Sequence, residues 1–160
     1  MNYQQLLKKV CLPLLLTAFA FSLFAQDCPH QALLDKLDKA MMEKNADMTA
    51  ALYHANAVRH TQEGDIEGVE KIREQTAEFF KDVPDAKSIN HDIICNGDYA
   101  VVRWEGKGTP AGSPRMVSVT GITIYKIKDG KVIEEWEEMN MLSLMMQMGF
   151  ELKPPGEAKD

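Results

Sequence analysis

The sequence has few of the residues that bind metals or cross-link a chain, since its 160 residues include only three cysteines and four histidines. The histidines stand at positions 30, 54, 60 and 91, and none has the His-x-x-x-His spacing of zinc enzymes, so we expect no metal site. Repeats and low-complexity tracts are also lacking. Because 45% of the residues are apolar, a disordered chain is excluded, and the length fits one globular domain.

Long hydrophobic runs are lacking except for residues 10–24, which follow Lys8 and Lys9 and precede Ala25. A basic start, an apolar run and a small residue at the cleavage point are typical of a secretory signal peptide. We therefore expect residues 1–25 to be removed and residues 26–160 to be exported to the periplasm or the medium. The alternative is an uncleaved N-terminal segment that anchors the protein to a membrane.

An excess of basic residues is lacking as well. Removing residues 1–25 takes away two lysines and no acid, which leaves 16 basic and 24 acidic residues and a net charge of −8. Such a chain repels nucleic acid and anionic membranes, so neither is expected as a partner. Cys28 and Cys95 remain after cleavage. They could pair in an oxidising compartment, but a free, buried Cys95 is an equal alternative.

The apolar spacing predicts helices in the first half of the mature chain and strands in the second. Apolar residues at three- and four-residue spacing favour helices over residues 27–45, 47–53 and 67–81, with a brief strand at 57–61 between them. Strands are expected at 87–95, 99–106, 116–126 and 131–139, because Asn96-Gly97-Asp98 and Asp129-Gly130 are turn signals. We expect an α+β fold, a curved antiparallel sheet with three N-terminal helices on one face, forming a cone with an interior cavity.

Four stretches of the sequence, in this order and spacing, resemble the SnoaL-like polyketide cyclases of the nuclear-transport-factor-two-like superfamily. They are 67–73 with Phe79, Phe80, Pro84 and Asp85; 97–104; 121–125 with 129–131; and 134–140 running to Gly149. The resemblance covers about residues 31–150. It implies a cone with a deep, mostly apolar pocket for a small molecule, frequent homodimers through the sheet, and an intramolecular aldol reaction that needs no cofactor.

The resemblance also assigns roles to individual residues. His60 takes the place of the family's pocket histidine, Trp136 matches its tryptophan, and Asn140 stands where the cyclases carry their acidic base. An amide cannot accept a proton at neutral pH, so the catalytic pattern is broken there. Glu138 shares a strand face with Asn140 and could replace the base. The alternative is that residues 134–138 are a solvated run of charge, and alternation does not tell which face looks inward.

Three functions follow from these observations. The first is an exported protein that binds a small apolar or amphipathic molecule in the cone, through His60, Arg103, Tyr125, Trp136 and Asn140. Arg103 and Tyr125 could equally point outward. The second is a cofactor-independent cyclase, isomerase or hydratase in which Glu138 or His60 is the acid or base. The third is a dimeric interaction domain with a vestigial pocket.

Overall fold

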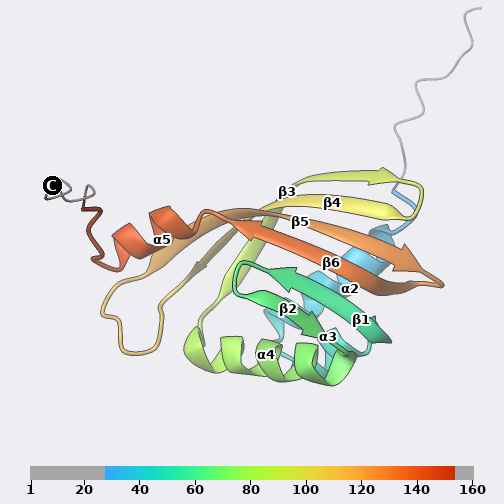
Figure 1. The fold of residues 1–160 in the computed structure, drawn as a ribbon, viewed down its shortest axis with the longest axis horizontal. Coiled ribbons are helices and arrows are strands. Elements are labelled where there is room, and N and C mark those ends of the chain that lie inside the picture. The colour runs from blue at the N-terminus through green and yellow to red at the C-terminus, as the bar shows by residue number, and fades with distance from the viewer. Residues whose placement is uncertain (1–27, 154–160) are drawn as a thin grey trace, which may run out of the picture.

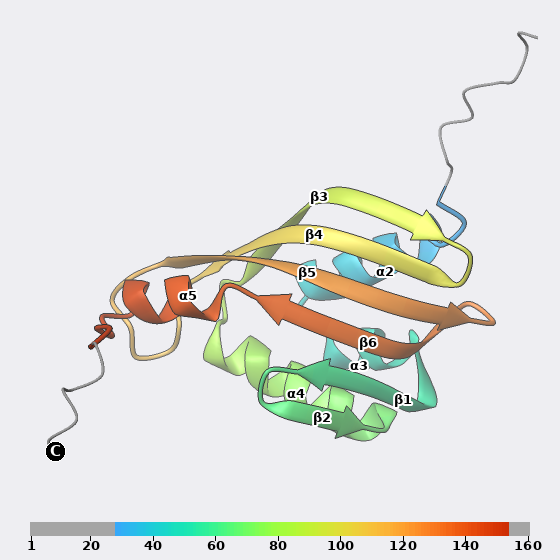
Figure 2. The ribbon, with the colours of Figure 1, turned by 45° about the horizontal axis from the view of Figure 1, so that its top comes forward.

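The computed structural model describes residues 28–153, so the expected signal peptide lies outside the described residues. A curved six-stranded sheet carries helices α2 (Gln31–Met42), α3 (Ala46–Ala50) and α4 (Val69–Asp82) on one side, as Figures 1 and 2 show. A short helix, α5 (Met141–Gln147), lies at one end of the sheet. The strands are β1 (Tyr53–Thr61), β2 (Gly64–Glu67), β3 (Lys87–Asn96), β4 (Tyr99–Gly108), β5 (Val117–Lys128) and β6 (Lys131–Met139). The expected α+β fold is confirmed.

The three N-terminal helices form where the apolar spacing predicts them. In α4 the buried residues Ile72, Thr76 and Phe80 recur every four positions, which gives one face to the sheet. Asn45 caps the start of helix α3, and its side-chain oxygen accepts a hydrogen bond from the Met48 backbone N–H at 2.9 Å. The start of α4 differs from the prediction, because residues 64–67 pair with β1 as strand β2.

The sheet is mixed rather than antiparallel. Its order is β2-β1-β6-β5-β4-β3, and every neighbouring pair is antiparallel except β1 and β6, which run in the same direction. The expectation of an antiparallel sheet is therefore wrong at this one pair. Parallel neighbours need a long connection, and here β2, α4 and the β3–β5 meander supply it. Local apolar alternation predicts strands but does not tell which distant strand lies beside which.

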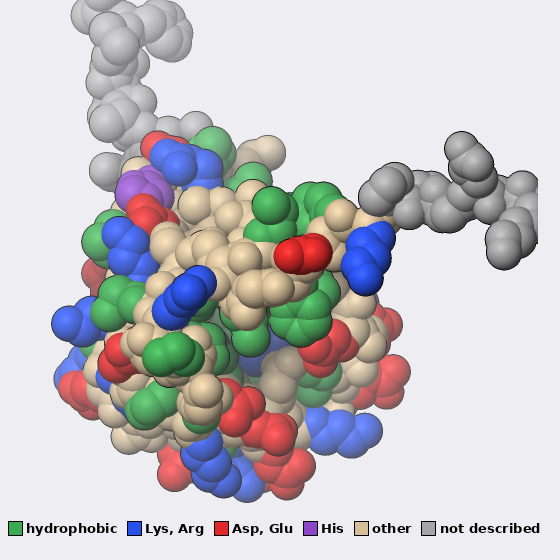
Figure 3. All heavy atoms as spheres, turned by 90° about the vertical axis from the view of Figure 1, so that its left-hand side faces the viewer, with side chains coloured by type: hydrophobic (Ala, Val, Ile, Leu, Met, Phe, Trp, Pro, Cys, Tyr) green, Lys and Arg blue, Asp and Glu red, His purple; other side chains and the backbone are tan. Residues whose placement is uncertain are grey.

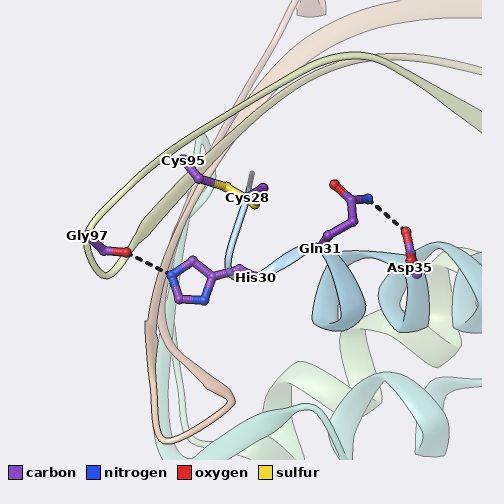
Figure 4. The surroundings of a disulfide bond; sticks show 6 residues. All are labelled: Cys28, His30, Gln31, Asp35, Cys95 and Gly97. Carbon is purple, nitrogen blue, oxygen red and sulfur yellow. Dashed lines mark hydrogen bonds between the residues drawn. A yellow bond between two sulfur atoms is a disulfide. The ribbon is translucent and has the colours of Figure 1, made fainter. Parts of the chain in front are cut away.

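A disulfide joins Cys28, just before α2, to Cys95 near the end of β3. Figure 4 shows it beside the β3–β4 turn, where the His30 ring also lies 2.8 Å from the Gly97 carbonyl oxygen. Cys95 is only 5% exposed and belongs to the core between the sheet and α2. Of the two alternatives that the sequence left open, the structure has the paired cysteines. Within residues 28–153 no helix is long and apolar enough to cross a membrane.

Candidate functional site in the interior of the cone

An irregularity in β6 decides which of its acids face the helices. The pairing of β6 with β5 slips by one residue between Val132 and Glu134, which makes Ile133 the extra residue of a β-bulge. Val132 is fully buried and Glu135, three positions later, is 2% exposed, so both point toward the helices. Beyond the bulge the alternation continues, and Glu137 faces inward with Glu135. The opposite, outer face carries Glu134, Trp136 and Glu138.

Glu135 is held in a buried ion pair that β1 and α4 complete. Its Oε2 accepts hydrogen bonds from Arg59 Nε and from the Tyr53 hydroxyl, both at 2.7 Å. Arg59 Nη2 donates to the Tyr53 oxygen at 3.0 Å, and Nη1 donates to Gln75 Oε1 at 2.9 Å and Thr76 Oγ1 at 3.3 Å. These contacts fix a negative and a positive charge against the inner face of the sheet.

Glu137 is the unusual group of this interior. Burial raises the pKa of its carboxyl to about 7, with a further rise from the negative charge of Glu135 and an opposing effect of the Arg59 guanidinium. None of the hydrogen bonds within residues 28–153 involves its carboxyl, although its strand neighbour across the sheet is Thr123. A carboxyl that is half protonated at neutral pH and has no partner can both take and give a proton.

Aromatic and hydroxyl groups lie beside this acid on β4 and β5. Burial, and then the charge of Glu135, raises the pKa of the Tyr125 phenol well above its ordinary value, so Tyr125 stays a neutral donor. Trp104 Nε1 donates to Thr123 Oγ1 at 2.8 Å. The Trp104 ring lies against Gly121, where any Cβ would collide with it, so this position requires glycine.

Three side chains of the inner face are not fully sealed from solvent. Trp104, Tyr125 and Glu137 point toward the helices, yet each keeps some accessible surface. Figure 3 views the molecule from the end where α5 lies and shows a hollow near the centre of that face.

An open groove of about 450 Å³ runs along α5 at the same end of the molecule. Asn140, at one end of this groove, follows Glu137 by three residues, so the groove adjoins the strand end that carries the buried acid. Gln147 fixes α5 to β5, because its side-chain oxygen accepts from Ser118 N at 2.9 Å and its Nε2 donates to Ser118 O at 2.7 Å.

The residues singled out in the sequence are distributed over both faces of the sheet. Tyr125 lies in the interior. His60 stacks on Trp136 on the outer face, with ring centroids 5.3 Å apart, and the His60 ring nitrogens lie 2.8 Å from Asp65 Oδ1 and 3.2 Å from Glu134 Oε1. These contacts occupy both ring nitrogens outside the cone.

The other three candidates also lie away from Glu137's carboxyl. Arg103 pairs with Asp92 at 2.6 Å and is half exposed. Glu138 is exposed on the outer face. Asn140 begins α5, and its Oδ1 accepts from the Ser143 backbone N–H at 3.1 Å.

Sequence reasoning did not single out the inner cluster, which consists of Tyr53, Arg59, Glu135 and Glu137. Glu135 and Glu137 belong to the charged run 134–138, which resembles a solvated sheet edge. No residue type in the sequence indicates the β-bulge at Ile133. One usable signal was Arg59, a long cation that directly follows the small apolar residues Ala57 and Val58 in a short strand.

The fold and this inner cluster define an α+β domain with charged groups buried between a curved sheet and its helices, and comparison with known proteins gives the family. The profile of the SnoaL-like polyketide cyclases matches residues 31–148. The chain belongs to the SnoaL-like polyketide cyclase family, as the resemblance in the sequence predicted. No curated protein gives a significant match.

Solved structures agree with this assignment. TsrD from Streptomyces laurentii is 27% identical over 74% of this chain and 93% of its own, with a TM-score of 0.68. A SnoaL-like protein from Jannaschia sp. CCS1 is 19% identical over 77% and 93%, with a TM-score of 0.69. AclR from Streptomyces galilaeus is 19% identical over 75% and 95%, with a TM-score of 0.68. The last two likenesses concern the fold alone.

Proposed function

We propose that this protein is a cofactor-independent enzyme that moves a proton on a small molecule bound inside the cone, as a cyclase or isomerase does. The observation that carries the proposal is Glu137, an inward carboxyl with a pKa of about 7 and no hydrogen-bond partner among the described residues. Glu137 supplies an acid or base inside the cone. Asn140 cannot fill this role, because an amide does not accept a proton at neutral pH and its side-chain oxygen caps α5.

The chemistry follows from the charges around Glu137. Its ionised carboxylate takes a proton from a carbon beside a carbonyl group, and the C–H electron pair moves toward the carbonyl oxygen to form an enolate. The neutral phenol of Tyr125 donates a hydrogen bond to that oxygen. In an isomerisation, the proton returns to a different carbon of a conjugated enolate, so that the double bond moves. In a cyclisation, the enolate carbon forms a bond to a second carbonyl carbon, which closes the ring, and the alkoxide left on that carbonyl oxygen takes the proton from Glu137. General acid–base catalysis of this kind contributes about 10²–10⁴-fold in rate.

Glu137 and Glu138 provide a matched pair for testing this proposal, since they are neighbours on opposite faces of one strand. The probe is 2-tetralone in D₂O, with deuterium uptake beside its carbonyl followed by mass spectrometry. The wild type should accelerate exchange, Glu137→Gln should lose at least 100-fold of that acceleration, and Glu138→Gln should keep it. Equal rates for wild type and Glu137→Gln would refute Glu137 as the base.

Ligand binding is tested separately by native mass spectrometry of residues 26–160 followed by organic extraction. A co-purified small molecule would name the compounds to assay for turnover. If such a molecule is found and the protein does not turn it over, the binding function inferred first from the sequence is the correct one.

We further propose that the mature protein is exported. The Cys28–Cys95 disulfide supports this, since such bonds persist in oxidising compartments. Fractionation of expressing cells should place the processed chain outside the cytoplasm, with its N-terminus near Gln26. Recovery of the unprocessed chain in the cytoplasm would contradict export, and recovery in the membrane would favour the anchored alternative.

The outer face of the sheet supports a homodimer, because it exposes several large apolar side chains. They are Ile89, Ile94, Tyr99 and Ile122, which are 41–64% exposed. Burying such a patch against a second copy would remove apolar surface from water. Sedimentation should give a dimer for the wild type and a monomer for Ile122→Lys, whereas a monomeric wild type would refute the dimer.

A further inference from the structure

The single guanidinium of the inner cluster has little capacity left for a ligand. Arg59 donates from Nε to Glu135, from Nη1 to Gln75 and Thr76, and from Nη2 to Tyr53. Since a guanidinium has five N–H groups, at most one remains free. The Tyr53 hydroxyl has no donor left for a ligand either, because its one O–H donates to Glu135.

The acids are not balanced in the same way. Glu135 and Arg59 neutralise one another at 2.7 Å, and within residues 28–153 Arg59 is the only cation whose charge acts on the Glu137 carboxyl. Glu137 therefore has no cation of its own. When it ionises, the interior carries one uncompensated negative charge, next to the aromatic side chains of Tyr125 and Trp104.

We propose that the hollow selects ligands that carry an ammonium group and rejects those that carry a carboxylate. This inference rests on the proposed function for the position of the ligand beside Glu137. An ammonium group would supply the missing counter-charge, and neighbouring aromatic rings favour cations. A carboxylate would be desolvated beside Glu135 and Glu137 with no free cation to pair with, which is costly in a protein interior.

Three probes of similar size and shape separate charge from fit. Choline is cationic, 3,3-dimethylbutan-1-ol is its uncharged analogue, and 3,3-dimethylbutanoate is anionic. Binding is measured by titration calorimetry at pH 8 and pH 6. With a pKa of about 7, Glu137 is about nine-tenths ionised at pH 8 and about one-tenth at pH 6.

At pH 8 we expect choline to bind at least tenfold tighter than the alcohol, and the carboxylate not to bind. At pH 6 the advantage of choline over the alcohol should shrink several-fold. Glu137→Gln should abolish that advantage at both pH values, and Glu138→Gln should preserve it. Because Glu137 makes no hydrogen bond that glutamine would lose, the variant should fold, and the pH comparison on the wild type gives the same test without any substitution.

Equal binding of choline and the alcohol would overturn the inference, as would a preference that survives Glu137→Gln. Failure of every probe to bind would overturn it as well. The deuterium exchange of 2-tetralone is independent of these outcomes. If exchange depends on Glu137 while choline shows no preference, the proposed function stands and only the inferred ligand class is wrong. If neither assay involves Glu137, both proposals fail.

Discussion

Reducing the Cys28–Cys95 disulfide should remove a large part of the protein's stability. The bond links residues 67 positions apart, and it ties the segment before α2 to β3 in the core. In the oxidised unfolded chain this loop stays closed, which restricts the number of conformations that the chain can adopt. Reduction releases that restriction and so favours the unfolded state.

The magnitude follows from the length of the loop. The chain-entropy relation for a closed loop of this size gives a loss of about 4 kcal/mol at room temperature. Domains of this size unfold with free energies of about 5–15 kcal/mol, so the loss would be a third or more of the total in most cases. The fold would survive reduction at room temperature, but its melting temperature should fall by well over ten degrees.

Urea unfolding, followed by tryptophan fluorescence, measures the change. The oxidised protein is compared with the same protein in a reducing agent and with Cys28→Ser, which leaves the buried Cys95 in place. The two perturbations should agree within about 1 kcal/mol, because both open the same loop. A free energy of unfolding that reduction leaves unchanged would refute the argument. Two reactive thiols in the unfolded, unreduced chain would refute the disulfide itself.

Three further predictions concern the interior. Because folding raises the pKa of Glu137 to about 7, the folded state binds the proton more tightly than the unfolded state does. The free energy of unfolding should therefore fall by about 3 kcal/mol between pH 4.5 and pH 7.5. Urea unfolding measures this dependence on pH, and Glu137→Gln should flatten it. Arg59→Met should destabilise the fold by about 3–5 kcal/mol, because it leaves Glu135 unpaired. The same variant should raise the pKa of Glu137, which a carboxyl-carbon NMR titration measures. An unchanged or lower pKa of Glu137 would contradict the assigned charges. Gly121→Ala should lower the melting temperature in calorimetry, because its Cβ would collide with the Trp104 ring and the Glu138 carbonyl oxygen.

Local patterns predicted most of the elements. The apolar repeat of α4 and the turn signals at residues 96–98 and 129–130 act over a few neighbouring positions, so they can be read without knowing the fold. Strand β2 was missed because residues 64–67 are mostly polar and their only pairing is with β1. The parallel contact of β1 with β6 joins segments about 75 residues apart in sequence, and no local pattern encodes it.

The candidate site was harder, and β6 shows why. Alternation groups Glu134, Trp136 and Glu138 on one face and Glu135 and Glu137 on the other, and the structure has the same grouping. What alternation could not give was the inward face. Buried Val132 suggests by parity that Glu134 and Trp136 look inward, but the bulge at Ile133 reverses this. One inserted residue therefore determines which acids face the helices.

The position of the disulfide also determines how the domain can be attached to something else. Cys28 fixes the start of the described chain at the β3–β4 turn, whereas α5 lies at the opposite end of the sheet (Figures 1 and 2). That opposite end carries the hollow seen in Figure 3. A tether joined to the chain before Cys28 would therefore hold the domain by the end remote from the hollow. Immobilised through that end on a sensor surface, the protein would present the hollow to the solution.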